Sequence, residues 1–427
     1  MIASTLILLL ALIGIGIPVA AALGVLALMM DPLYSMLPLT RAMGVMAWNS
    51  SNEFLLVAIP LFIMLGEILL RAGFAERMYG AASLWLSWLP GGLMHANIGA
   101  STLFSATSGS SVATAATVGT VALPQIKRFG YSEPLFLGSV AAGGTLGILI
   151  PPSINLVIYA VLTNSSVPRL YLAGIIPGVL AALLFMSVIV AACLIRPEWG
   201  GQRIRASWGE RFASLVHLLP PLGIFLLVVG SIYAGVATPT EAAALGVVGA
   251  LALAAAFGRL NLKMMREVAE NTMRSSAMIM IIIVAAGFLN FVMSAVGLID
   301  AITKGIAGLN VSPGAMLFVI VVFYVILGCF METLSMMITT IPIVAPVMTA
   351  LGFDSVWLGI VIILLVETAL ITPPVGLNLF VVQSLRKSGS MQAVINGSLP
   401  FVLALFTMIA LLAAFPGLAL WLPSVVG

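Results

Sequence analysis

The octapeptide Leu149-Ile150-Pro151-Pro152-Ser153-Ile154-Asn155-Leu156 recurs later in the chain, with one insertion, as Ile371-Thr372-Pro373-Pro374-Val375-Gly376-Leu377-Asn378-Leu379. Each copy lies inside an otherwise apolar stretch. Proline removes a backbone donor and frees carbonyl groups of the preceding turn, so it breaks or kinks a helix. The two copies therefore predict two broken apolar helices, over about 134–165 and about 355–385.

The two broken helices belong to a longer duplication at a spacing near 222 residues. Pro124 matches Pro346 at this offset, and the two Pro-Pro pairs match each other in the same register. Several Gly and Pro positions in one register are much less expected by chance than a single Pro-Pro match. We therefore divide the chain into a first repeat with its scaffold helices, residues 1–210, and a second repeat, residues 211–427.

The composition places the duplication in a membrane. Of 427 residues, 62% are hydrophobic and 7% are charged, whereas a soluble domain has roughly 25% charged residues. A spanning helix takes ~20 apolar residues, so the chain holds roughly ten to twelve spans. Apolar runs long enough to span lie at about 2–28, 54–70, 168–195, 213–233, 239–257, 274–293 and 395–420. The sequence predicts an all-α polytopic protein in the lipid bilayer.

The same composition excludes other classes of protein. The net charge is only +3, and no basic stripe with interleaved aromatic residues suggests nucleic acid. The chain has two histidines and neither an H-E-x-x-H motif nor a phosphate-binding loop, so we expect no enzyme and no ATP-driven pump. A channel would show a polar stripe along a pore rather than paired broken elements.

Loop charges predict the orientation. The segments 196–211 and 259–274 each contain four Lys or Arg residues, and both should be cytoplasmic. The turn between the two intervening spans reads Thr238-Pro239-Thr240-Glu241, which predicts a helix-capping box. Counting spans onward predicts a periplasmic C-terminus and a periplasmic N-terminus.

Two further apolar regions, about 92–126 and about 313–350, are interrupted by small and polar residues. Each is too long for one span and too broken for two, so each predicts a re-entrant helical hairpin. The first ends at Lys127-Arg128 and should enter from the cytoplasm, whereas the second should enter from outside. Inverted repeats whose broken helices meet near the membrane midplane are a transporter architecture.

The hairpin tips carry the candidate chemistry. The first tip, 105–111, has five hydroxyl groups in seven residues. Exposed hydroxyls and carbonyls at this depth suit a small cation, although Ser and Gly also allow close helix packing. In the alignment of the two repeats, Glu332 aligns with Ser110 and Glu367 aligns with Thr145. An intramembrane carboxylate could ligate a cation, carry a proton or accept hydrogen bonds from exposed backbone.

A substrate would lie between the two tips. Half-helix N-termini there present free N–H groups and a positive dipole end, which suits a carboxylate, and neither tip contains Lys or Arg. The substrate-facing candidates are Ser111, Asn155, Glu332 and Asn378. The two asparagines have the alternative role of hydrogen bonding between helices.

Four separated motifs resemble the large membrane subunit of tripartite ATP-independent periplasmic (TRAP) transporters. They are Ser-Ala-Thr-Ser-Gly-Ser-Ser-Val-Ala-Thr-Ala at 105–115, Gly-Thr-Leu-Gly-Ile-Leu-Ile-Pro-Pro-Ser at 144–153, Thr-Pro-Thr-Glu-Ala-Ala-Ala at 238–244 and Thr-Pro-Pro-Val-Gly-Leu-Asn at 372–378. The resemblance extends over essentially the whole chain.

The resemblance implies an elevator-type, sodium-driven importer of a small organic acid, such as sialic acid or a dicarboxylate, in the bacterial inner membrane. It also implies two partners, a small four-helix membrane subunit and a periplasmic substrate-binding protein. The alternative is a stand-alone sodium- or proton-coupled carboxylate transporter. Sodium would be the coupling ion and the only metal, with no organic cofactor.

Carried over residue by residue, the resemblance implies two sodium sites. The first would involve Ser108, Ser110, Gly144, Thr145 and Ile148. The second would involve Thr339, Thr340, Thr368, Thr372 and Gly376.

Overall fold

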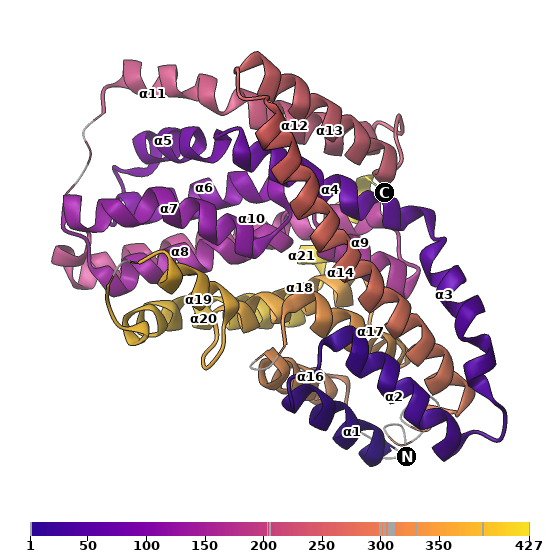
Figure 1. The fold of residues 1–427 in the computed structure, drawn as a ribbon. Coiled ribbons are helices and arrows are strands. Elements are labelled where there is room, and N and C mark those ends of the chain that lie inside the picture. The colour runs from indigo at the N-terminus through magenta and orange to yellow at the C-terminus, as the bar shows by residue number, and fades with distance from the viewer. Residues whose placement is uncertain are drawn as a thin grey trace.

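The computed structural model describes residues 2–202, 204, 206–298, 301, 305, 312–328, 331–386 and 388–426. Its regular elements are helices, and the described residues form no strand beyond an isolated bridge between Tyr131 and Gly200. Figure 1 shows the helices gathered into one bundle, with the long α14 (Leu262–Ala295) crossing it obliquely. The prediction of an all-helical chain is confirmed.

The first hairpin and the first broken helix follow each other in the chain. The hairpin is α6 (Leu93–Ser108) and α7 (Ser111–Phe129), and it turns at Gly109 with φ of 60°. The broken helix is α8 (Glu133–Thr145), the 3-10 turn η3 (Leu146–Ile148) and α9 (Ile154–Thr163). The helix α10 (Val167–Ile195) and the turn η4 (Pro197–Trp199) follow.

The second half repeats this order. Its hairpin is α16 (Pro313–Gly328) and α17 (Thr333–Ala350), and its broken helix is α18 (Ser355–Ile371) and α19 (Leu377–Ser384). The chain ends with α20 (Met391–Ala414) and α21 (Gly417–Val426). In both halves the helix stops just before a Pro-Pro pair and restarts after it.

The N-terminal region differs from the predicted single span over 2–28. The chain forms α1 (Ile2–Gly14) and α2 (Val19–Tyr34), because Gly16 with φ of 81° and Pro18 interrupt the apolar run. The hydroxyl groups of Ser4 and Tyr34 lie 2.5 Å apart, so the start of α1 meets the end of α2. The next elements are η1 (Leu39–Ala42), α3 (Met43–Ser51), η2 (Phe54–Val57), α4 (Ala58–Arg71) and α5 (Phe74–Leu86).

The central helices link the two halves. They are α11 (Trp208–Ser214), η5 (Leu215–His217), α12 (Leu219–Tyr233), α13 (Pro239–Ala256) and α14. The predicted capping box is confirmed, because Thr238 caps the backbone of Glu241 and the Glu241 carboxylate accepts from the Thr238 amide at 2.8 Å. The basic segment 259–274 is not a loop, since α14 already begins at Leu262.

Among the described residues, six helices are long and apolar enough to cross a membrane. They are Phe54–Arg71, Val167–Ile195, Pro239–Ala256, Leu262–Ala295, Thr333–Ala350 and Met391–Ala414, and the bent pair from Trp208 to Tyr233 is a seventh candidate. Several of the shorter apolar helices, α9, α16 and α18, belong to the hairpins and broken helices. Short helices of this kind satisfy the lipid environment only when neighbouring helices cover their ends.

Polar contacts tie the two broken helices together at both ends. At one end Arg386 donates to the Glu133 carboxylate at 2.6 Å. At the other, the Tyr159 hydroxyl donates to the Ser355 carbonyl at 2.7 Å, and the hydroxyls of Ser165 and Ser355 lie 2.9 Å apart. Because α8 also packs against α18 and α19, the two broken helices form one body.

The backbones of α8 and α20 approach each other closely at Gly138 and Gly397. A Cβ atom built on Gly138 would overlap the carbonyl of Gly397, and one built on Gly397 would overlap the carbonyl of Pro134. Small residues at such a crossing let membrane helices approach closely, which strengthens their van der Waals contact. The close approach holds α8 of the first broken helix directly against α20.

We expect Gly138→Ala to destabilise the protein, because the added methyl group must push α8 away from α20. Overpacking of this kind costs about 1–3 kcal/mol. The melting temperature of the purified protein in detergent measures the effect. Gly223→Ala is the matched control, since nothing lies within 4 Å of a Cβ atom at that position. Equal melting temperatures for the two variants would contradict the packing described.

Candidate functional site

A cavity of about 180 Å³ lies where the two hairpin tips meet. Its wall combines the tip of α6–α7, the break of α8–α9, the tip of α16–α17 and one face each of α4 and α14. The polar residues that line it are Glu67, Ser108, Ser110, Ser111, Asn155, Ser275, Glu332 and Thr333. Segments more than 200 residues apart in the sequence therefore build one site, between the two hairpins as the sequence predicts for a substrate.

The tip of the first hairpin packs against the break of the first broken helix. A Cβ atom on Gly147 would lie 2.8 Å from the carbonyl oxygen of Ser110, so only glycine allows this approach. The Ser111 hydroxyl donates to the carbonyl of Thr145 at 3.3 Å. The Ser153 hydroxyl donates to the carbonyl of Ile148 at 2.5 Å. These contacts satisfy carbonyls that the helix break leaves open.

The residues of the first predicted sodium set lie around this junction. Ser110 is the N-cap of α7, and its hydroxyl oxygen accepts from the Ala113 amide at 3.4 Å. The Thr145 hydroxyl donates within its own helix, to the Ala142 carbonyl at 2.7 Å. Ser108 lies on the opposite side of the tip, where a Cβ atom on Gly66 would be 2.9 Å from its carbonyl oxygen.

Gly144 lies deeper in the same junction. A Cβ atom there would meet Ala115 of the hairpin and the side-chain nitrogen of Asn378, at 2.6 and 3.0 Å. The structure thus brings Ser110, Gly144, Thr145 and Ile148 to one contact between hairpin and broken helix, and it places Ser108 at the contact with α4.

The second hairpin tip is organised by a carboxylate. Glu332 is the N-cap of α17, and its Oε1 accepts from the Ser335 amide and hydroxyl, both at 3.0 Å. Its Oε2 accepts from the Leu334 amide at 3.2 Å and from the Thr333 hydroxyl at 3.3 Å. Both oxygens of the carboxylate are therefore engaged, and the charge sits at the positive end of the helix.

The second predicted sodium set is divided between two places. The Thr372 hydroxyl donates to the Thr368 carbonyl at 2.6 Å, and a Cβ atom on Gly376 would lie 3.0 Å from the Thr372 carbonyl oxygen. These three residues thus meet at the break of the second helix. Thr339 and Thr340 instead line a separate cavity of about 60 Å³ between α16, α17 and α1.

Three of the four substrate-facing candidates line the main cavity. Ser111, Asn155 and Glu332 do so, and the buried Nδ2 of Asn155 has no hydrogen-bond partner among the described residues. Asn378 does not line it, because its Nδ2 donates to the carbonyl of Ala141 at 3.2 Å. That bond joins the second broken helix to the first, which is the helix-to-helix role that the sequence left open for this residue.

Glu367 lies apart from the cavity. Its side chain is fully buried, beside the backbone of Leu149 in the first broken helix. Leu370, one helical turn further on, does line the cavity.

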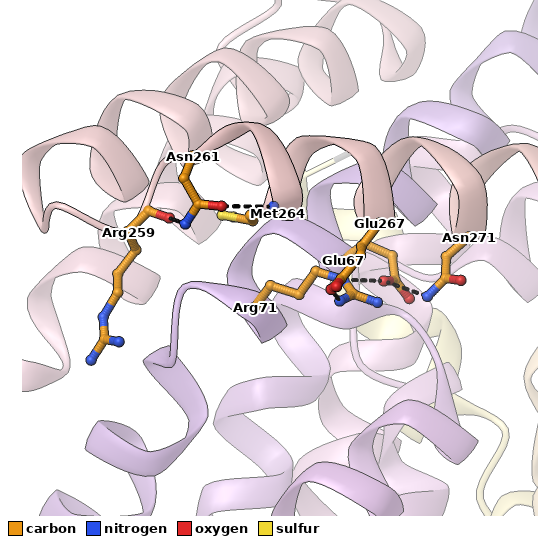
Figure 2. Close-up of polar contacts among 7 residues, drawn as sticks. All are labelled: Glu67, Arg71, Arg259, Asn261, Met264, Glu267 and Asn271. Carbon is orange, nitrogen blue, oxygen red and sulfur yellow. Dashed lines mark hydrogen bonds and ion pairs between the residues drawn. The ribbon is translucent and has the colours of Figure 1, made fainter.

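Sequence reasoning missed the polar cluster on α4 and α14, which Figure 2 shows. Glu67 lines the cavity, and its Oε2 accepts from Arg71 and from Asn271, both at 3.1 Å. Arg71 also pairs with Glu267 across the two helices. A carboxylate inside the apolar run 54–70 is the signal that could have found it.

The fold and the cavity define a multi-pass membrane protein of the transporter class. The family model for the DctM component of the tripartite ATP-independent periplasmic transporter matches residues 6–418. The chain belongs to this family. It is thus the large permease of a binding-protein-dependent importer in the inner membrane, and its family is one of transporters rather than of enzymes.

Permeases named for several different substrates resemble the chain about equally. It is 34% identical to the C4-dicarboxylate TRAP transporter large permease protein DctM of Pseudomonas aeruginosa, over 91% of this chain and 90% of that one. It is 32% identical to the sialic acid permease SiaM of Vibrio cholerae, over 87% of each chain. It is also 32% identical to the ectoine permease TeaC of Halomonas elongata, over 86% of each.

A solved structure shares the fold. The YdaH transporter of Alcanivorax borkumensis aligns with a TM-score of 0.64 over 93% of this chain and 97% of that chain, at 18% sequence identity. The predicted fold class, an all-helical membrane protein with the fold of a transporter, is confirmed.

We expect Gly147→Ala to lift the first hairpin tip from the break, because the added methyl group would lie 2.8 Å from the Ser110 backbone. Hydrogen exchange of the amides at 109–115 should accelerate, since the tip loses its seat. Gly80→Ala, at a position with nothing within 4 Å, is the control. Unchanged exchange in Gly147→Ala would show that the tip does not depend on this contact.

Proposed function

We propose that the chain drives sodium-coupled import of a small organic acid. It works as the transporting subunit beside a small membrane subunit and a periplasmic binding protein. The observation that carries the proposal is the cavity between the two hairpin tips, which is lined by hydroxyl groups and lies against both a broken helix and the α4–α14 face. Polar broken elements that meet inside an apolar bundle are where transporters hold solute and coupling ion.

Sodium is the proposed coupling ion because both junctions offer oxygen ligands, which hard cations prefer. The first junction offers Ser110, Thr145 and the carbonyls from Gly144 to Ile148, with Ser108 across the tip. The second offers Thr368, Thr372 and the Gly376 region, and Thr339 and Thr340 are the weaker members because they line another cavity.

An organic acid is the proposed solute. The relatives named for C4-dicarboxylates, sialic acid and ectoine all handle molecules that carry a carboxylate. In this chain, the first turn of α7 and the unpartnered amide nitrogen of Asn155 face the cavity and are suitable donors to such a group. A carboxylate transporter that works without a binding protein is the second candidate, with the same site.

We further propose an elevator movement, in which the body of hairpins and broken helices slides along α4 and α14, and periplasmic positions for both termini. Support for the sliding surface comes from Gly66 on α4, which faces the backbone of Ser108 without an intervening side chain. A smooth contact of this kind allows translation without unlocking interdigitated side chains.

The test is uptake by proteoliposomes that contain the permease and the small subunit, with the binding protein added outside. Organic acids are supplied with and without an inward sodium gradient. Uptake that needs both the gradient and the binding protein supports the proposal. Gradient-driven uptake without the binding protein favours the second candidate. Binding-protein-dependent uptake that ignores the sodium gradient would refute sodium coupling.

We expect Gly66→Leu to abolish uptake, because a leucine on α4 must clash with the Ser108 backbone that moves past it. The purified variant should still fold and assemble with the small subunit, which gel filtration checks. Gly223→Leu, on an open face of α12, is the control. Normal uptake by Gly66→Leu would argue against sliding along α4.

A further inference from the structure

The cavity carries negative charge only. Among the described residues that line it, the ionisable ones are Glu67 and Glu332, and none is Lys, Arg or His. Arg71 offsets part of the charge of Glu67, but it also pairs with Glu267, so this cluster keeps a net negative charge. A solute with two carboxylates would therefore meet two fixed carboxylates in a site of low dielectric.

The two hairpin tips are electrostatic opposites. At the second tip the N-terminus of α17 is already filled, because the Glu332 carboxylate accepts from the amides of Leu334 and Ser335. An anionic group of the solute finds no free helix end there. What this tip presents to the cavity is the edge of a carboxylate.

The first tip is open to an anion. The neutral hydroxyl of Ser110 caps α7 and accepts a hydrogen bond from the amide of Ala113. The first amides of a helix have no partner inside it, and no described residue accepts from those of Ser111 and Val112. The side chain of Asn155 is 3% exposed, and its unpartnered Nδ2 adds a donor at the same cavity.

From this polarity we propose that the solute is a small zwitterion. Its carboxylate binds the first turn of α7 and Asn155, and its cationic nitrogen group faces Glu332 and Glu67. The inference rests on the proposed function and narrows its substrate class. In the repeat alignment, Ser110 and Glu332 occupy equivalent positions, so a neutral cap in one half and a charged cap in the other give the site its two poles.

The first test compares ligands of equal length on the permease purified with its small subunit, in sodium and without the binding protein. The pairs are β-alanine with malonate, γ-aminobutyrate with succinate and δ-aminovalerate with glutarate, and ectoine is an additional zwitterion. Ligand-induced increase of the melting temperature is the readout. We expect at least one zwitterion to stabilise the complex more than its paired dicarboxylate. Equal or greater stabilisation by every dicarboxylate, or none by any zwitterion, would overturn the proposal.

The second test removes the negative charge at the second hairpin tip. Glu332→Gln keeps the side-chain length and one acceptor for the α17 amides, and it should weaken binding of the preferred zwitterion roughly 10- to 100-fold, the value of a hydrogen bond to a charged group. The paired dicarboxylate should bind more tightly than before. Glu270→Gln is the control, because this exposed carboxylate pairs with Arg266 and, among the described residues, with no other cation.

The two tests separate this inference from the proposed function. One outcome would refute the proposal that the solute is a zwitterion and leave the proposed transport function intact. It is sodium-driven, binding-protein-dependent uptake of a dicarboxylate, with the same ligand preference in Glu332→Gln and wild type. Absence of sodium coupling for a solute that is imported would refute the proposed function, whereas the preference for zwitterions in the melting experiment would still stand.

Discussion

The structure depends on one constraint, which is that peptide groups freed by a helix break inside a membrane must find partners within the protein. Two apolar helices are broken at Pro-Pro pairs, and in each half a hairpin tip packs against the break. The first break is satisfied by the hydroxyls of Ser111 and Ser153, and the second by those of Thr372 and Ser398. In the first half the hairpin itself takes part in this hydrogen bonding through Ser111, whereas in the second half the donors are Thr372 of the break and Ser398 of α20.

The same constraint places the polar groups that a transporter needs. Hydroxyls and carbonyls that satisfy a break lie next to a tip that faces the opposite half, so coupling-ion ligands and solute donors share one region. The helix that follows the hairpin tip is capped by Ser110 in the first half and by Glu332 in the second. A duplication with unequal caps gives the cavity one neutral and one negatively charged end, which two identical tips would not do.

Much of this architecture is predictable from the sequence because proline and glycine act locally. The Pro-Pro pairs, the Gly109 turn and the 222-residue register are sufficient to predict two hairpins and two broken helices. Six of the predicted spans overlap membrane-length helices or the bent pair. The run 2–28 was predicted wrongly, because hydropathy does not distinguish one long helix from two short ones separated at Gly16 and Pro18.

The site was predictable only in part. Ser111, Asn155 and Glu332 follow from motif and repeat, whereas Asn378 donates to the Ala141 carbonyl of α8, although it is the second residue of α19 just as Asn155 is the second residue of α9. The contribution of α4 and α14 could not be inferred, since no repeat or motif marks the face of a scaffold helix. Which helix face meets the tips is decided by long-range packing, to which Gly66 and Glu67 contribute.

The central claim is that the cavity between the hairpin tips holds the solute. A structure of the permease complex with sodium and its transported solute tests it most directly. The account predicts solute density in contact with Ser111 and Asn155, and ion density at the junctions of tips and breaks. Solute density elsewhere, for example in the apolar cavity beside Leu103 and Ile150, with an empty space between the tips, would contradict it.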